Sequence, residues 1–440
     1  MGCLKKMKTI QAYSYNILDD LDMELEVNKN PFNIDIKELF GMAARINKKR
    51  SFLFVSKVLG KHIPVSPFKV MYMGRLLGEL YATKEYKMEN ELSKKTVSFE
   101  IEDVKKELLK NKIVLPENNI FIGFAETATA LGHSVFETFE NAKYIHTTRE
   151  NINEEPIFDF KEEHSHATDH KVFSQDKAFF ENENPIVLVD DEITTGKTAL
   201  NIIKGIHEKY PRQSYSILTL LDWRTDEHKK NYVEMENTLG IKINVYSLIS
   251  GNVKVTGTAD IKKDNIDLYN IKEEVEINEY YFDDLFATIY KNYIEFTGRF
   301  GIDSKIHKNI EDVSKKVAKK IDGKESKKLV LGVGEFMFLP LKIASFMSGE
   351  VCYHSTTRSP ILARKKSNYA IQSKFIMHNI YDSTVKEFLY NIPKDYYDSV
   401  YIFYERYSSK EEVDKMKKAL KKIGIKKINM CFMINNKGGE

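Results

Sequence analysis

Cysteine is scarce in this chain, and so are long apolar segments and any excess of charge of one sign. The three cysteines, Cys3, Cys352 and Cys431, lie far apart and form no Cys-x-x-Cys pair, which argues against a disulfide framework and a zinc knuckle. No apolar run approaches the roughly 18 residues that a membrane-spanning helix needs. The first residues, Met1–Lys6, show neither a signal-peptide core nor a myristoylation signal. We therefore expect a cytoplasmic protein.

The charged residues nearly cancel, because 67 Lys and Arg face 64 Asp and Glu and leave a net charge of +3. No global field then favours nucleic acid or a membrane as partner. The hydrophobic fraction of 42% is that of a globular protein, and 440 residues exceed one ordinary core. Two or three domains are expected.

Strand and helix patterns alternate from about residue 119 onward, which predicts a parallel, doubly wound α/β sheet. Helices are expected at Glu126–Asn141 and Lys197–Lys209. The expected strands of this sheet are Asn119–Phe124, Lys143–Thr147, Pro185–Asp190, Tyr215–Leu221 and Lys242–Leu248.

Two further strands are expected upstream, at Phe52–Val58 and Phe68–Met73, from their aromatic and β-branched residues. The lysine-rich stretch near residues 301–328 is interpreted as a helical connector. A second strand–helix–strand unit follows it. The expected domains are therefore 1–300, with an N-terminal hood, and 329–440.

The strongest signal is the segment Pro185–Thr198, where a buried strand runs into two acids, a short loop and a helix. Backbone N–H groups at a helix start and threonine hydroxyls can surround a phosphate, and the helix dipole favours the anion. The adjacent carboxylates can accept hydrogen bonds from two vicinal sugar hydroxyls. The loop residues concerned are Thr194, Thr195, Gly196, Lys197 and Thr198, and the acids are Asp190 and Asp191.

Two simpler interpretations of this segment compete with a phosphate site. The acids could merely cap a helix, which does not require the whole string. Gly196-Lys197-Thr198 could belong to an ATPase P-loop, but that pattern needs a glycine where this chain has Asp191.

The segment resembles the signature by which type I phosphoribosyltransferases bind phosphoribosyl pyrophosphate (PRPP). That resemblance implies that Asp190 and Asp191 hold the ribose hydroxyls and that Thr194–Thr198 holds the 5-phosphate. It also implies Mg²⁺, held through PRPP near the two acids without a direct protein ligand. The stretch Ala125, Glu126, Thr127 and Ala128 looks like the pyrophosphate loop of the family, although a tight strand–helix turn has a similar composition.

Arg149 ends the next expected strand and is the candidate pyrophosphate ligand. A polar segment after it contains His164, His166 and His170. In orotate-type enzymes the equivalent stretch is a lid, often contributed by a neighbouring subunit, so the resemblance implies lid histidines and a homodimer. A metal site at His166 and His170, or a solvated loop, is the alternative.

The same resemblance points to a base site. Phe52–Pro64 resembles the hood of orotate phosphoribosyltransferases, and Arg224 ends a strand where that family carries a base-contacting arginine. Lys57, Lys61 and Arg224 are the candidate base ligands, and such cations suit an acidic or carbonyl-rich base.

The C-terminal part contains Thr357-Arg358-Ser359-Pro360. This string resembles the TRSP domain, which follows an orotate-type phosphoribosyltransferase domain in proteins of bacterial tellurium- and stress-response gene clusters. The resemblance extends over nearly the whole chain.

The C-terminal part also resembles the first domain of the same chain. The interval from Glu126 to Arg149 equals the interval from Glu335 to Arg358, and each arginine follows two threonines. We interpret the second domain as a degenerate copy that keeps Glu335, Thr357 and Arg358, followed by Ser359. Phe403-Tyr404 is expected in place of the two acids, so this copy should bind no PRPP.

The expected function is a Mg-dependent phosphoribosyltransferase that joins PRPP to a small base and releases pyrophosphate. Two alternatives remain. One is a PRPP- or nucleotide-sensing regulator without catalysis, and the other is an enzyme that runs the reaction in reverse.

Overall fold

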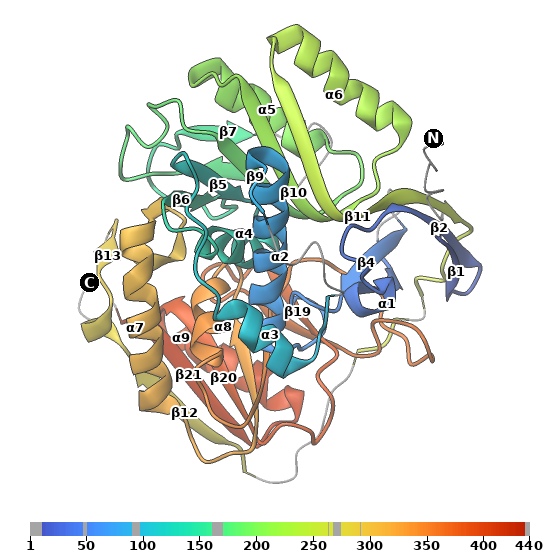
Figure 1. Cartoon of the computed structure of the whole chain (residues 1–440). Coiled ribbons are helices and arrows are strands. Elements are labelled where there is room, and N and C mark those ends of the chain that lie inside the picture. The colour runs from blue at the N-terminus through green and yellow to red at the C-terminus, as the bar shows by residue number, and fades with distance from the viewer. Residues whose placement is uncertain are drawn as a thin grey trace.

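Two β-sheets, each with a parallel core, form two lobes of the molecule, and a long helix lies between them (Figure 1). The computed structural model describes residues 11–46, 51–89, 97–160, 170–262, 264–266, 274–290 and 292–435. Within this part of the chain, no helix is both long and apolar enough to cross a lipid bilayer.

The first lobe contains an eight-stranded sheet whose five central strands are parallel. The edge strands β1, β2 and β15 pair antiparallel. In spatial order the strands are β1 Gln11–Leu18, β2 Leu21–Lys29, β11 Lys242–Thr256, β10 Ser214–Asp222, β9 Ile186–Ile193, β5 Asn119–Gly123, β6 Ala142–His146 and β15 Ile302–Asp303.

The second lobe contains a five-stranded, wholly parallel sheet. The chain forms β12 of this sheet before it returns to the first sheet at β15, so the two lobes are interleaved. The spatial order is β12 Glu276–Tyr281, β21 Lys427–Ile434, β20 Ser399–Arg406, β16 Lys327–Gly332 and β17 Glu350–Ser355.

Four antiparallel hairpins complete the described strands. They are β3 Phe40–Ala44 with β4 Phe52–Ser56, β7 Phe158–Phe160 with β8 His170–Val172, β13 Thr288–Ile289 with β14 Tyr293–Ile294, and β18 Lys374–His378 with β19 Lys386–Tyr390. The helices are α1 Ile36–Leu39, α2 Pro67–Tyr86, α3 Ile101–Leu108, α4 Ala128–Glu137, α5 Lys197–Lys209, α6 Asp226–Leu239, α7 Ser304–Ile321, α8 Phe338–Ala344 and α9 Lys410–Leu420.

Most expected elements of the first lobe are confirmed, including the strands β4, β5, β6, β9, β10 and β11 and the helices α4 and α5. The expected strand at Phe68–Met73 is wrong, because these residues lie in α2. Every residue from Val70 to Ala82 is buried, including the ion pair of Arg75 and Glu79, so the helix has no solvent-exposed face there. A short window of a helix that is apolar all round cannot be told from a buried strand.

Helix α2 reaches its central place through two glycines that face α4. A Cβ atom on Gly74 would clash with the backbone of Ser134, and one on Gly78 would lie 2.9 Å from the side chain of Thr138. The missing side chains therefore allow close approach of the two helices. Figure 1 shows α2 running between the two lobes.

The two lobes repeat one topology. The order β10-β9-β5-β6 in the first sheet corresponds to β21-β20-β16-β17 in the second. Gly123 pairs with His146 across β5 and β6, and Gly332 pairs with Ser355 across β16 and β17. Gly332 follows Gly123 in the sequence by the same interval as Ser355 follows His146. The predicted duplication is therefore confirmed in strand order and in register.

The register corrects one detail of that prediction. Val189 pairs with Gly123, and Phe403 pairs with Gly332. Tyr404 and Glu405 therefore occupy the places of Asp190 and Asp191, one residue later than the sequence comparison suggested. The second lobe has kept one carboxylate at this position.

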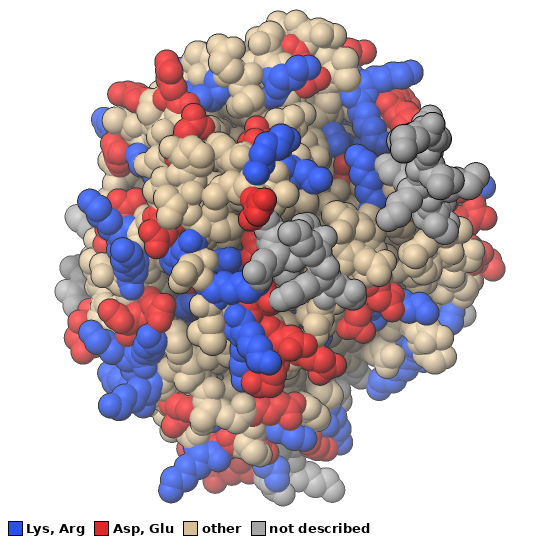
Figure 2. All heavy atoms as spheres, viewed as in Figure 1, with Lys and Arg blue, Asp and Glu red and all other residues tan. Residues whose placement is uncertain are grey.

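The surface carries both signs of charge side by side on the face shown in Figure 2. This mixture agrees with the small net charge of +3. A surface patch of one charge therefore does not mark a binding site on this face.

Candidate active site

A cavity of about 550 Å³ opens where β5, β6 and β9 of the first lobe end. Three parts of the chain line it. The hood, which we define as β3, β4 and residues 57–66, supplies Leu53, Phe54, Ser56, Lys61 and His62. The first lobe supplies Ala125, Glu126, Thr127, Arg149, His170, Asp190, Asp191, Glu192 and Thr198, and the second lobe supplies Arg358, Ser359 and Pro360.

The loop between β9 and α5 is shaped for close approach to a ligand. Gly196 has a φ of 75°, which favours glycine, and a Cβ atom there would clash with the hydroxyl of Tyr232. The Tyr232 hydroxyl donates a hydrogen bond to the Gly196 carbonyl at 3.1 Å. Helix α5 begins at Lys197, whose N–H donates to Thr195 Oγ1 at 3.4 Å, and the positive end of the helix dipole at this start favours an anion.

The carboxylates of Asp190 and Asp191 stand side by side at the end of β9, on the cavity wall. Burial, and next the charge of Asp191, raise the pKa of Asp190 well above its usual value. Two adjacent buried carboxylates are stabilised by a bound proton, by hydrogen bonds from sugar hydroxyls or by a cation. The pair thus fits Mg²⁺ held mainly through ligand oxygens, and among the described residues no group of three His, Cys, Asp or Glu could hold a metal alone.

The loop after β5 is tied to β6 and to the β7–β8 hairpin. The Ala125 N–H donates to Thr147 Oγ1 at 2.9 Å, and His170 Nδ1 lies 2.9 Å from the same hydroxyl. His170 Nε2 lies 3.1 Å from Arg149 Nη2. Since a guanidinium only donates, Nε2 accepts and the proton of His170 sits on Nδ1.

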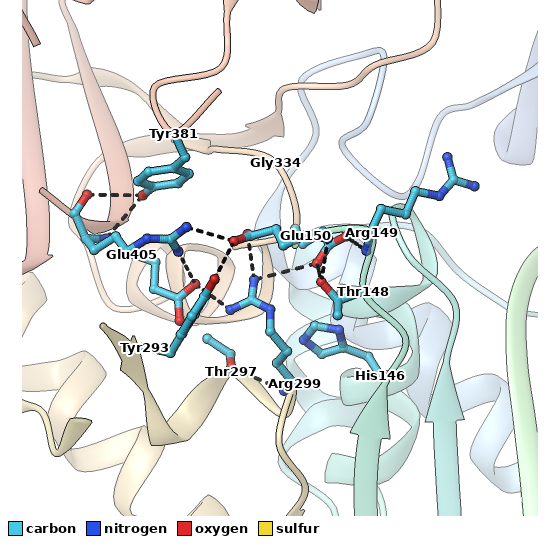
Figure 3. Close-up of polar contacts among 12 residues, drawn as sticks. His146, Thr148, Arg149, Glu150, Tyr293, Thr297, Arg299, Gly334, Tyr381 and Glu405 are labelled. Atoms are coloured by element: carbon cyan, nitrogen blue, oxygen red, sulfur yellow. Dashed lines mark hydrogen bonds and ion pairs between the residues drawn. The ribbon is translucent and has the colours of Figure 1, made fainter. Parts of the chain in front are cut away.

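His170 is held neutral, because burial, and then the charge of Arg149, lower its pKa to about 3. The guanidinium of Arg149 points away from the junction of the lobes (Figure 3) and lines the cavity. The other two expected lid residues, His164 and His166, lie outside the described residues.

The three expected base ligands are not brought together. Lys61 donates to the hydroxyl of Thr127 and lines the cavity. Lys57 instead donates to the Lys37 carbonyl at 2.8 Å. Arg224 forms two hydrogen bonds of 2.9 Å to Asp222 and lies over the ring of Tyr232.

The two lobes exchange equivalent contacts at their junction. Glu335 of the second lobe accepts hydrogen bonds from the Thr148 hydroxyl at 2.5 Å and the Arg149 N–H at 2.7 Å. Glu126 of the first lobe accepts from the Thr357 hydroxyl at 3.2 Å and the Arg358 N–H at 3.4 Å. Each glutamate therefore holds the threonine–arginine turn of the opposite lobe.

The position in the second lobe that corresponds to the cavity of the first lobe contains a buried arginine. The sequence alone did not predict a role for this residue. Arg299 is fully buried, 2.6 Å from Glu405, 3.1 Å from Glu150 and 3.6 Å from Glu335 (Figure 3). Arg406 adds a contact of 2.8 Å to Glu150. The carboxylates at this part of the junction are thus paired with the guanidinium groups of Arg299 and Arg406.

The N-terminus of α9, the second-lobe helix that corresponds to α5, is also occupied by side chains of the chain itself. Ser409 caps α9 by accepting from the Glu412 N–H at 3.2 Å, and Glu411 and Glu412 fill the first turn. Acidic residues there occupy the positive end of the helix dipole. This helix start therefore differs from that of α5, whose first turn contains no acidic residue.

Comparisons with known families agree with the two lobes. Residues 39–252 match the family described as Phosphoribosyl transferase. The sheet order and the β9–α5 loop of the first lobe agree with this match. Residues 296–420 match the family described as TRSP domain C terminus to PRTase_2. The first lobe thus contains the part of the chain that resembles a phosphoribosyltransferase, and the part that resembles a TRSP domain follows it.

Solved structures with a resembling fold are adenine phosphoribosyltransferases. Those from Trypanosoma brucei, Leishmania tarentolae and Giardia lamblia are 15%, 15% and 13% identical, with TM-scores of 0.24, 0.28 and 0.29. The matches cover 33%, 48% and 49% of this chain and 62%, 85% and 96% of the solved chains. The Trypanosoma match thus spans less than two thirds of that enzyme. No curated protein matches the chain.

Proposed function

We propose that the chain is a Mg-dependent phosphoribosyltransferase that joins the ribose 5-phosphate of PRPP to a small base and releases pyrophosphate. The observation that supports this best is the sharing of one cavity by an acid pair, Thr198 in the first turn of α5 and the cations Lys61 and Arg149. These groups match the two hydroxyls, the 5-phosphate and the pyrophosphate of one ligand.

Asp190 and Asp191 would accept hydrogen bonds from the vicinal ribose hydroxyls. The first N–H groups of α5, with Thr194, Thr195 and Thr198, would hold the 5-phosphate. Arg149 and Lys61 would neutralise the pyrophosphate beside the loop Ala125–Ala128. Bound Mg²⁺ would add positive charge at the pyrophosphate oxygens.

The reaction follows from this placement. A ring nitrogen of the base attacks ribose C1 while the bond from C1 to the pyrophosphate oxygen breaks, and the electron pair leaves with pyrophosphate. The cations stabilise the leaving group in place of water. No general base is needed for an acidic acceptor, whose nitrogen already carries negative charge.

The acceptor would enter beside the hood, where Leu53 and Phe54 offer an apolar wall. Phe54 is itself stacked on Trp223, with ring centroids 5.2 Å apart, so the wall is rigid. This arrangement suits a flat ring. Lys61 is the one expected base ligand that reaches the cavity, and it lies at the pyrophosphate loop.

Other features remain proposals from family resemblance. They are the cytoplasmic location, the role in tellurium and stress responses, the homodimer with a shared lid, and the domain limits 1–300, 301–328 and 329–440. The rival functions are a PRPP sensor and the reverse, nucleotide-cleaving reaction.

The test is to incubate the chain with Mg²⁺ and PRPP against a panel of purine and pyrimidine bases and to measure pyrophosphate. We expect release that depends on one base or a few and is absent in the double variant Asp190→Asn/Asp191→Asn. PRPP binding without release for any base favours the sensor. Release of base from a nucleotide when pyrophosphate is supplied, with no forward transfer, favours the reverse reaction.

A further inference from the structure

We propose that the TRSP motif of the second lobe is part of the active site of the first lobe and that Arg358 is a ligand of the pyrophosphate group. This inference rests on the proposed function and names the role of a residue for which the resemblance implies none. It also explains why the second lobe accompanies the first.

The motif reaches across the junction of the lobes. Arg358, Ser359 and Pro360 line the same cavity as Arg149, Asp190 and Asp191. In the sequence, the motif lies far beyond every first-lobe residue of that cavity, on the other side of the helix α7. Only the packing of the two lobes brings the motif there.

The motif is anchored by the pyrophosphate loop itself. Glu126 belongs to that loop and holds the Thr357 hydroxyl and the Arg358 N–H through Oε2. The Ser359 N–H donates in turn to Thr357 Oγ1 at 3.2 Å. The backbone of the motif is therefore fixed relative to the loop that would contact the pyrophosphate.

The side chain of Arg358 is less constrained than its backbone. Its Nε lies 3.6 Å from Glu126 Oε1, outside hydrogen-bond distance, and 24% of the side chain is exposed. Glu126 Oε1 is buried and accepts no hydrogen bond from the residues that the structure describes. A guanidinium held this loosely at a cavity wall retains donors for an incoming anion, and its planar fork matches phosphate oxygens.

Three cations then surround one loop. Lys61 contacts Thr127 from the hood, Arg149 lies beside His170, and Arg358 contacts Glu126 from the second lobe. Pyrophosphate carries several negative charges, which these three cations would offset. The acids Asp190 and Asp191 are at the ribose end, so the cavity has the polarity that PRPP requires.

The mirror arrangement supports the assignment. Arg149 takes the place in the first lobe that Arg358 takes in the second, and its N–H is held by Glu335 as that of Arg358 is held by Glu126. In the second lobe, Arg299 fills the position that corresponds to the cavity, where it contacts the carboxylates of Glu150 and Glu405. Both arginines of the repeated motif therefore serve the first-lobe site.

The test uses the full chain and two separate ligands, inorganic pyrophosphate and ribose 5-phosphate, titrated with Mg²⁺ by calorimetry. Arg358→Ala should weaken pyrophosphate binding by about 10- to 100-fold. Ribose 5-phosphate affinity should stay within about twofold, since that ligand binds at β9 and α5. Lys386→Ala removes one cation from an exposed position of the same lobe and should change neither affinity.

The outcomes separate the two proposals. If the unmodified chain binds neither ligand, the proposed function fails. If it binds both and Arg358→Ala leaves pyrophosphate affinity unchanged, the function stands and this inference is overturned. Arg358→Gln, which keeps the backbone contacts, serves as a second variant, and melting temperatures of all variants show whether a loss reflects folding.

Discussion

The two lobes share a topology and a register but use the same positions in opposite ways. In the first lobe Asp190 and Asp191 face a cavity, whereas in the second Glu405 stands at the Asp191 position and binds Arg299 at 2.6 Å. The second lobe also has a carboxylate at this position, but there it contacts a buried side chain instead of lining the cavity. A fold can thus keep its charges while it loses its site.

The hairpins β7–β8 and β18–β19 show the same difference between the two lobes. Thr148 pairs with Lys171 of β8, and Thr357 pairs with Phe388 of β19. His170 and Glu387 therefore occupy equivalent places, each next to the threonine that receives an N–H from the loop after the first strand of its lobe. Neutral histidine in one lobe corresponds to a buried carboxyl in the other.

The largest effect should come from the acid pair. Asp190→Asn/Asp191→Asn should lower PRPP affinity by at least about 100-fold, because two charge-assisted hydrogen bonds are lost. The free energy of unfolding should not fall, since burial of a charge and, next, repulsion by Asp191, which raise the pKa of Asp190, no longer act on the amide. The mirror change, Glu405→Gln, should leave PRPP affinity unchanged and lower stability. Calorimetry and urea unfolding measure both, and PRPP affinity lost in Glu405→Gln instead would break the comparison.

Arg299→Met should be the most destabilising single change at the junction. It leaves Glu405, Glu150 and Glu335 buried without their shared cation, which typically costs about 3–5 kcal/mol. Lys386→Met, at an exposed position, should change the free energy of unfolding by less than about 0.5 kcal/mol. Urea unfolding of both variants provides the measurement. A loss below about 1 kcal/mol for Arg299→Met would show that these carboxylates find other partners.

Glu387 should give stability a pH dependence. Burial raises its pKa from 4.5 to about 7, so the folded chain binds this proton more tightly than the unfolded chain. The stability it contributes is complete below about pH 4.5 and is lost as the pH rises through 7. Glu387→Gln cannot ionise.

The stability difference between Glu387→Gln and the unmodified chain should therefore shift in favour of the variant by roughly 3 kcal/mol between pH 5 and pH 8. His170 has the opposite sign, because its pKa is lowered to about 3: its contribution is present above the unfolded pKa near 6.5 and is lost as the pH falls toward 3. Thermal unfolding of Glu387→Gln and His170→Gln across this range measures both slopes. Parallel slopes would contradict the opposite directions of the two pKa shifts.

Arg224→Ala should have the smallest effect. Arg224 lies over Tyr232, whose hydroxyl holds the Gly196 carbonyl, so its loss should loosen the phosphate loop. We expect ribose 5-phosphate affinity to fall by roughly two- to fivefold, well under the cost of a direct ligand. Steady-state kinetics are the control: a raised KM for the base with unchanged ribose 5-phosphate affinity would restore Arg224 as a base ligand.

Local patterns were sufficient for much of the first lobe. The string from Pro185 to Thr198 combines a strand, an acid pair and a glycine at a positive φ, and each of these is a short-range signal. The equal intervals from Glu126 to Arg149 and from Glu335 to Arg358 revealed the repeat for the same reason.

Long-range features could not be predicted in this way. The alternation of Leu21, Met23, Leu25 and Val27 marks β2, but its partner β11 comes from the far end of the first lobe's sequence. Arg299 gave no local signal, because its three carboxylate partners come from distant segments. The direction of Arg358 depended on how the lobes pack, which no motif encodes.

The central claim is that each chain holds one phosphoribosyl site, in the first lobe, and that the repeated lobe has lost its own. Calorimetric titration of the full chain with PRPP and Mg²⁺ tests it through the stoichiometry. The account predicts one PRPP per chain, and none in Asp190→Asn/Asp191→Asn. Two PRPP per chain, or one that persists in the double variant, would contradict it.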